Sequence, residues 1–257
     1  PAYRFLVQAY GTTSYELYDP QSLIRFDASN EKMVPVINNN VVSPSSYEMT
    51  FQQPEYSYTA LKDSLSSTEN DSRYLQLPDN LPQRVTDLAY EITDMYESVY
   101  DKARAVESYF ARSGFQYETT NVQIPKGNQD YVDQFLFETK LGYCDNFSTS
   151  MVVLLRSVGI QARWVKGFSS GERVQENDGM YTYVVTNNDA HSWVEAYIDG
   201  IGWVPFEPTI GFSNPMNINY DVDLEMPEEE QLPEMEEQPE VVQPELEEQD
   251  SQQPANG

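Results

Sequence analysis

The chain has 257 residues, enough for one or two domains with a substantial core. Its formal net charge is −27, and residues 214–257 hold 14 of the acidic side chains with no Lys or Arg. No basic stripe is present, so we exclude nucleic acid as a partner. One Cys and one His cannot form a Cys/His zinc cluster or an internal disulfide.

The ends of the chain and its apolar runs bear on its cellular context. The longest apolar run in the helical middle, Met151–Leu155, is far shorter than the ~20 residues of a membrane span. The chain opens Pro-Ala-Tyr-Arg, without an initiator Met or an apolar signal segment. We therefore expect it to be a piece of a longer protein.

Residues 1–78 are predicted to form a small β-rich subdomain. Apolar and aromatic stretches alternate there with turn-forming clusters such as Ser43-Pro44-Ser45-Ser46. Extended segments are expected at residues 3–10, 33–38, 47–51 and 56–61.

Between residues 82 and 112 the apolar residues recur at three- and four-residue steps, which predicts two helices with a break near 98–101. Asp101 is the expected N-cap of the second helix, and Ser113-Gly114 its expected end. A further short helix is expected over 131–137.

The clearest predicted helix covers residues 145–158, because one apolar stripe runs along it and Gly159 comes directly after it. Strands are expected after this helix, and the turn at 199–202 joins the last two as a tight hairpin. Helices succeeded by an antiparallel sheet predict an α+β core over residues 79–213. The predicted strands cover residues 162–168, 180–187, 191–198 and 203–206.

Two segments are expected to lack regular structure. Residues 169–179 are polar and predict a mobile loop, and residues 214–257 predict a disordered acidic linker rich in Pro, Glu and Gln. An acidic tail that binds a partner is the alternative for the second segment.

Cys144 lies where a loop becomes the first turn of the predicted helix. Unpaired backbone N–H groups and the helix dipole favour an anion there, which lowers the pKa of a thiol and can stabilise an oxyanion. Gly142 would allow close approach of a substrate to the backbone. The alternative is that Cys144 is a small buried apolar residue, as most free cysteines are.

A thiol nucleophile needs a base, and His191 is the one histidine available. It opens a predicted strand whose alternation puts His191, Trp193 and Glu195 on one face, away from the aliphatic face. The alternative is a structural histidine at the junction of a loop and a strand.

A third group would orient the imidazole. The hairpin returns the chain to Glu207, at the end of the strand beside the histidine strand. Asp189 is the competing orienter, and a solvated glutamate at a strand end is the alternative for Glu207.

At these residues the sequence resembles bacterial transglutaminase-like domains. The run Gly-Tyr-Cys-Asp-Asn-Phe within residues 135–151 is similar to the family's nucleophile segment, and residues 154–168 resemble the next segment of the family's sequence. Ala-His-Ser-Trp-Val-Glu-Ala-Tyr at 190–197 is similar to its histidine strand, and Gly-Trp-Val-Pro-Phe-Glu-Pro-Thr at 202–209 to its acidic segment. The blocks occur in the family's order and spacing, over roughly residues 85–212.

The resemblance implies a papain-like core with Cys144, His191 and Glu207 as a catalytic triad, and no metal or cofactor. Many family members carry Asp where this chain has Glu207. The pattern is similar to the extracytoplasmic domain of multi-pass bacterial membrane proteins. It therefore implies a soluble ectodomain on the extracytoplasmic face of the bacterial cell membrane, attached only through parts of the parent that are absent here. We expect this domain to be a monomer.

The activity that the resemblance implies is acyl transfer from a protein glutamine, through a thioester, to an amine such as lysine. The backbone N–H of Cys144 is one expected oxyanion donor, and the second comes from Tyr143 or Trp193. A deamidase or cysteine peptidase that hydrolyses the same intermediate is the alternative. A cell-envelope module that binds peptide or glycan in an inactive cleft is the alternative from another class.

Overall fold

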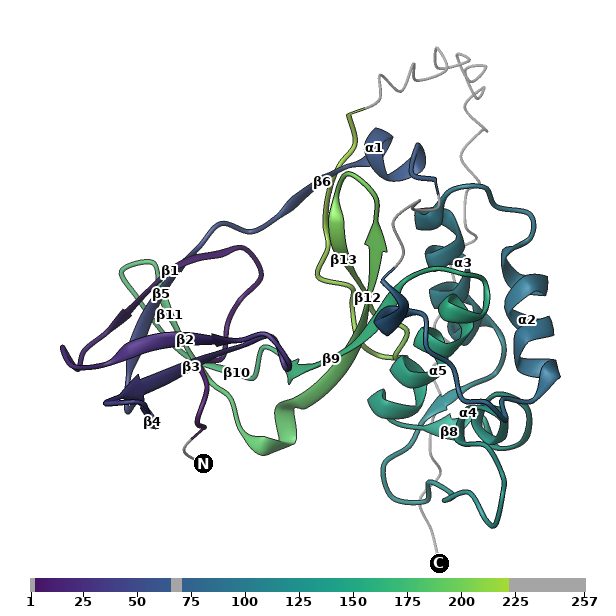
Figure 1. Cartoon of the computed structure of the whole chain (residues 1–257), viewed down its shortest axis with the longest axis horizontal. Coiled ribbons are helices and arrows are strands. Elements are labelled where there is room, and N and C mark those ends of the chain that lie inside the picture. Colours follow the sequence, from purple (N-terminus) through teal and green to yellow (C-terminus); the bar gives the residue numbers. More distant parts are fainter. Residues whose placement is uncertain (1–2, 66–70, 222–257) are drawn as a thin grey trace, which may run out of the picture. The chain divides into compact units, whose positions relative to one another are not determined.

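The structure is a computed structural model that describes residues 3–65 and 71–221 (Figure 1). The described residues belong to one compact unit. The predicted boundary at residue 78 lies inside this unit, after the last N-terminal strand, which ends at Ser57, and before the helix that begins at Gln83. Residues 222–257, most of the predicted acidic linker, lie outside the described residues.

The N-terminal region is rich in strands. β1 pairs with β5 and β3 pairs with both β2 and β4, all antiparallel. The elements are β1 (Thr12–Leu17), β2 (Leu23–Asp27), β3 (Lys32–Ile37), β4 (Asn40–Val41), β5 (Tyr47–Phe51), β6 (Glu55–Ser57) and the short helix α1 (Tyr58–Lys62).

Two predicted extended segments of this region differ from the structure. Residues 3–10 form no strand. The segment 56–61 is a strand only as far as Ser57, whose side chain accepts the backbone N–H of Ala60 and so caps α1. A local hydrogen bond from a Ser side chain thus ends the strand and begins the helix.

The helical part agrees with the predicted pattern. The elements are the 3-10 turn η1 (Ser72–Tyr74), α2 (Gln83–Thr93), α3 (Val99–Arg112), β7 (Gln116–Tyr117), α4 (Tyr131–Gln134), the π-helical turn η2 (Phe135–Thr139), β8 (Leu141–Gly142) and α5 (Cys144–Ser157). α3 begins two residues before its predicted N-cap, because Ser98 accepts the backbone N–H of Asp101. It ends at Ser113 and Gly114, as predicted.

A three-stranded antiparallel sheet packs against α5, and Figure 1 shows the helix beside it. β12 (Ala190–Ile198) is the central strand, between β9 (Ala162–Phe168) and β13 (Gly202–Phe206). These strands and the hairpin at 199–202 agree with the sequence prediction. A 3-10 turn, η3 (Asn187–Asp189), leads into β12.

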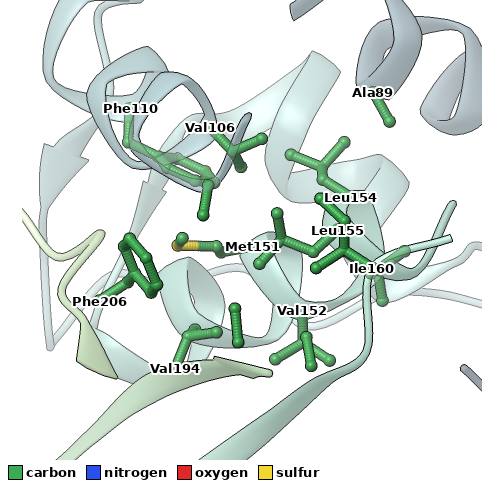
Figure 2. Packing of buried hydrophobic residues seen from close by; sticks show 14 of the residues in the cluster. Ala89, Val106, Phe110, Met151, Val152, Leu154, Leu155, Ile160, Val194 and Phe206 are labelled. Atoms are coloured by element: carbon green, nitrogen blue, oxygen red, sulfur yellow. The ribbon is translucent and has the colours of Figure 1, made fainter. Parts of the chain in front are cut away.

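The core lies between this sheet and the helices. Val194, Ala196 and Ile198 of β12 are fully buried on the face that alternation predicts. Met151 of α5 lies near Phe206 of β13 in the core (Figure 2). Burial of such side chains contributes roughly 1.5–3 kcal/mol each, so this layer holds the ends of α5 and β12 at fixed positions.

The predicted loop at 169–179 and the predicted linker each contain a strand. β10 (Glu172–Asn177), in that loop, forms an antiparallel hairpin with β11 (Met180–Val184) through Asp178 and Gly179, both with positive φ. β11 lies inside the strand predicted over 180–187, whereas β10 is exposed along its whole length and shows no burial pattern that would predict it. β14 (Asn217–Asn219), inside the predicted linker, pairs in parallel with β6.

Candidate active site

The turn from β8 into α5 holds Cys144 as the first residue of the helix. Tyr143, the N-cap, has an extended backbone, and its N–H donates to Asn146 Oδ1 at 3.1 Å. A Cβ on Gly142 would lie 2.5 Å from the Asn146 side chain, so glycine leaves room for this cap. That Gly142 lets a substrate approach the backbone stays a prediction, because the Asn146 side chain occupies only the space where a Cβ would lie.

β12 brings His191 to the thiol. α5 packs against β12, and His191 lies opposite Gly167 in the sheet register. Both residues are buried, and the imidazole of His191 lies close enough to the sulfur to lower the pKa of the Cys144 thiol. The two residues that the sequence singled out, 47 positions apart in the chain, are therefore neighbours in the fold.

The other side of the imidazole is bound by Glu207, which comes directly after β13. His191 Nε2 lies 2.6 Å from Glu207 Oε2, and both side chains are less than a tenth exposed. The second oxygen, Oε1, accepts the backbone N–H of Thr209 at 2.8 Å. Both carboxylate oxygens are thus engaged, which fixes the rotamer that faces the imidazole.

The electrostatics favour a thiolate–imidazolium pair. Burial raises the pKa of Cys144, but hydrogen bonds from His191 and Ser192 outweigh it and bring the pKa below its ordinary value. Burial lowers the pKa of His191, but hydrogen bonds to Cys144 and Glu207 outweigh it and raise the pKa to about 9. The lowered pKa raises the fraction of thiolate at a given pH, and the thiolate is the form that attacks a carbonyl carbon.

Asp189, the competing orienter, does not contact the imidazole. Its carboxylate accepts the backbone N–H and the hydroxyl of Thr186, at 2.6 and 2.8 Å, and so caps η3. These hydrogen bonds lower the pKa of Asp189. Between the two acids that the sequence left open, the geometry selects Glu207 as the partner of His191.

One donor group of each candidate for the second oxyanion donor is engaged in another hydrogen bond. The backbone N–H of Tyr143 donates to Asn146, and Trp193 Nε1 donates to the Tyr10 hydroxyl at 2.6 Å. Cys144 is the first residue of α5, so its own N–H has no acceptor within the helix. The role of the backbone N–H of Cys144 as the first oxyanion donor stays a prediction, and the helix leaves this group available for it.

Aromatic rings cover the faces of the imidazole. Phe212 stacks on His191 with ring centroids 4.1 Å apart and an interplanar angle of 16°. Trp193 lies nearly parallel to it at 6.2 Å, where Gly167 leaves room for the indole. Tyr117 packs against Phe212 at 5.8 Å. Phe212 was not among the residues predicted for the site, and no local pattern indicates its contact with the histidine.

Glu107 of α3 is a second residue that the sequence prediction missed. It is buried, pairs with Arg104, and accepts the backbone N–H of Glu207 at 2.7 Å and Asn214 Nδ2 at 2.9 Å. Burial raises its pKa. A signal existed: Glu107 lies four residues after Ala103 and three before Phe110, on the apolar face of the helix. A charged residue at such a position indicates a buried polar contact.

Residues 3–65 and 71–221 offer neither a metal site nor a membrane span. Within these ranges, no three His, Cys, Asp or Glu side chains gather in a way that could hold a metal ion. None of the helices in this part of the chain has the length and apolar character needed to cross a membrane.

Comparison with known proteins identifies relatives of this chain. The family model of the Transglutaminase-like superfamily matches residues 86–208. The uncharacterized protein YebA of Bacillus subtilis (strain 168) is 49% identical over 201 residues, 75% of this chain and 27% of that protein. A protein-glutamine gamma-glutamyltransferase of Pseudomonas aeruginosa is 33% identical over 150 residues, 58% of this chain and 22% of that protein. The chain thus spans about a quarter of the length of these relatives.

A solved structure has the same fold. The periplasmic domain of TgpA from Pseudomonas aeruginosa, crystallised with ethylmercury bound, superposes with a TM-score of 0.59 at 26% identity. The match covers 81% of this chain and 68% of that one, and it supports the predicted α+β core. Residues 86–208 therefore form a transglutaminase-like domain, and the chain is homologous to these proteins of Bacillus subtilis and Pseudomonas aeruginosa.

Proposed function

We propose that this domain transfers the acyl group of a protein glutamine side chain to an amine, with Cys144, His191 and Glu207 as its catalytic triad. The observation that carries the proposal is one buried site that holds all three side chains: His191 Nε2 lies 2.6 Å from Glu207 Oε2, and His191 lowers the pKa of the Cys144 thiol. A thiol, a base and a buried acid in this order are the components of nucleophilic acyl transfer. The 33% identity to a protein-glutamine gamma-glutamyltransferase supports the choice of substrate.

In the first half of the reaction the Cys144 thiolate attacks the carboxamide carbon of glutamine. The carbonyl oxygen becomes an oxyanion, and the backbone N–H of Cys144 donates a hydrogen bond to it. The tetrahedral intermediate collapses and the C–N bond breaks. The imidazolium of His191 gives its proton to the leaving nitrogen, which departs as ammonia. A thioester on Cys144 and a neutral imidazole remain.

In the second half an amine attacks the thioester carbon. His191 removes a proton from the attacking nitrogen, and the C–S bond breaks to restore the thiolate. An isopeptide bond is the product when the amine is a lysine side chain. Throughout, Glu207 holds the imidazole by Nε2 and stabilises its protonated form, so the other ring nitrogen, Nδ1, faces the sulfur.

The cellular setting is part of the proposal. We expect the domain to act outside the cytoplasm of a bacterium, as part of a membrane protein, on proteins or peptides that offer glutamine and a primary amine. Homology to the periplasmic domain of TgpA supports this setting. The net charge of −27 disfavours anionic polymers such as nucleic acid as substrates.

The test is amine incorporation. The domain is incubated with a glutamine-containing protein and a fluorescent primary amine, and ammonia release is measured in parallel. We expect label in the protein and an equal amount of ammonia, both abolished by Cys144→Ala. Ammonia without label would indicate deamidation instead. If Cys144→Ala still incorporates the label, Cys144 is not the nucleophile of the reaction.

A further inference from the structure

The hydroxyl of Ser192 lies among three hydrogen-bonding groups beside the thiol. Ser192 is 1% exposed. Its Oγ lies 2.9 Å from Ser148 Oγ and 3.0 Å from Asp145 Oδ1. The sulfur of Cys144 lies 3.9 Å from the same Asp145 oxygen, and the hydroxyl and backbone N–H of Ser192 lower the pKa of the thiol. A hydroxyl carries one hydrogen, so Ser192 donates to only one of these groups at a time.

Asp145 competes with the sulfur for that hydrogen. The Cys144 thiol donates to Asp145 Oδ1 across 3.9 Å, the same oxygen that accepts from Ser192. When the thiol proton moves to His191, the sulfur becomes an anion close to a carboxylate, and two like charges disfavour each other. A donor that turns from the carboxylate to the sulfur offsets this cost.

Ser148 and Trp164 keep the hydroxyl groups satisfied in both arrangements. Trp164 Nε1 donates to Ser148 Oγ at 2.7 Å, and Ser148 can donate either to the backbone carbonyl of Cys144 at 2.7 Å or to Ser192. When Ser192 turns its hydrogen to the sulfur, its oxygen can accept from Ser148. Since Ser148 is fully buried, a hydroxyl left without a partner would be costly.

We propose that Ser192 is a thiolate-stabilising residue. Its hydroxyl donates to Asp145 while Cys144 is a thiol or a thioester, and turns to the sulfur while Cys144 is a thiolate. The inference rests on the proposed nucleophilic role of Cys144. It assigns to Ser192, the residue after His191 on β12, a part in forming the nucleophile and in releasing it on acylation.

The other titratable groups around the sulfur come from several elements. On β12 and after β13 they are the paired His191 and Glu207, and on α5 the nearest is Asp145. Three tyrosines also face the site, and burial raises the pKa of each, so they stay neutral where the thiol titrates. They are Tyr117 of β7, Tyr131 of α4 and Tyr143 before α5. Asp145 is therefore the anion that Ser192 must offset.

The test uses the single thiol of the chain as its own reporter. The rate of alkylation of Cys144 by iodoacetamide is measured against pH in the wild type, Ser192→Ala and Ser150→Ala. Ser150 is the control, because it lies on α5 like Cys144 and its buried hydroxyl has no hydrogen-bond partner among the described residues. We expect Ser192→Ala to raise the midpoint of this pH profile, which reports the pKa of Cys144, by about one pH unit. Ser150→Ala should leave the midpoint unchanged.

Equal midpoints in Ser192→Ala and the wild type would overturn the inference, and so would an equal shift in Ser150→Ala. Asp145→Asn is the second variant, for the case in which Ser192→Ala does not fold. It removes the competing charge and should lower the midpoint, whereas no change or a rise would contradict the switch. Alkylation requires no glutamine substrate. Shifted midpoints in a chain that incorporates no amine would therefore contradict the proposed acyl transfer and support the role of Ser192.

Discussion

Glu207 Oε2 lies 2.6 Å from Nε2 of His191 in a site where both side chains are almost fully buried. A buried carboxylate beside an imidazole stabilises the imidazolium, and a protonated histidine in turn stabilises a thiolate. The acid therefore affects the nucleophile, which it does not touch, through the pKa of the residue between them.

The first prediction concerns this pair. Glu207→Gln keeps the shape of the side chain and removes its charge, so the pKa of His191 should fall from about 9 by about one unit or more. Since the chain has a single histidine, one imidazole signal in an NMR pH titration reports the change. Asp189→Asn is the control, because Asp189 caps η3. If the pKa of His191 is the same in Glu207→Gln as in the wild type, Glu207 does not stabilise the imidazolium.

The second prediction concerns pH. The active form needs a thiolate, which forms as pH rises through the lowered pKa of Cys144, and an imidazolium, which is lost as pH rises through about 9. The rate of amine incorporation should therefore trace a bell with its alkaline limb near pH 9. An alkoxyamine acceptor keeps the titration of the amine out of the profile. A rate of amine incorporation that still rises steeply above pH 9 would contradict a requirement for the thiolate–imidazolium pair of Cys144 and His191.

The third prediction concerns Phe212, whose ring stacks on the imidazole at 4.1 Å. Phe212→Ala removes the ring that holds one face of His191, so amine incorporation should fall roughly tenfold, since misplaced catalytic groups are costly. The free energy of unfolding should change by only about 1 kcal/mol, because the ring is partly exposed. Phe51→Ala, on exposed β5, is the matched control. Equal activity in the two variants would show that the stacking has no catalytic consequence.

The fourth prediction concerns Glu107. Glu107→Ala leaves the backbone N–H of Glu207 and the amide of Asn214 without their buried acceptor. The free energy of unfolding should fall by about 2–3 kcal/mol in urea denaturation. Glu91→Ala, on the exposed face of α2, should change it by less than about 0.5 kcal/mol. If both variants unfold at the same urea concentration, the buried contacts of Glu107 add nothing to stability.

Much of the core could be predicted from local sequence. The apolar stripe of α5 and the alternation along β9 and β12 express directly which face is buried. The short hairpin after β12 then brings the chain back beside it, which places Glu207 near His191. The local patterns and the short hairpin are thus enough to predict that Cys144, His191 and Glu207 lie close together.

The remaining features depend on contacts between distant residues or on surfaces without a pattern. The choice between Asp189 and Glu207 depends on a cap at η3, and the stacking of Phe212 depends on the path of the chain after β13. Trp193 donates to Tyr10, 183 residues away, in a region with no motif. β10 lies in the segment predicted to be a loop, and it is exposed along its whole length, so no pattern of buried residues indicates this strand.

The most direct test of the central claim is the intact mass of the protein during the reaction. With a glutamine-containing peptide and no added amine, the account predicts a covalent adduct with the mass of the peptide minus one ammonia. Peptide mapping should locate it on Cys144, and an added amine should discharge it. Modification of the peptide with no adduct on the protein, or an adduct that survives Cys144→Ala, would contradict acyl transfer through this cysteine.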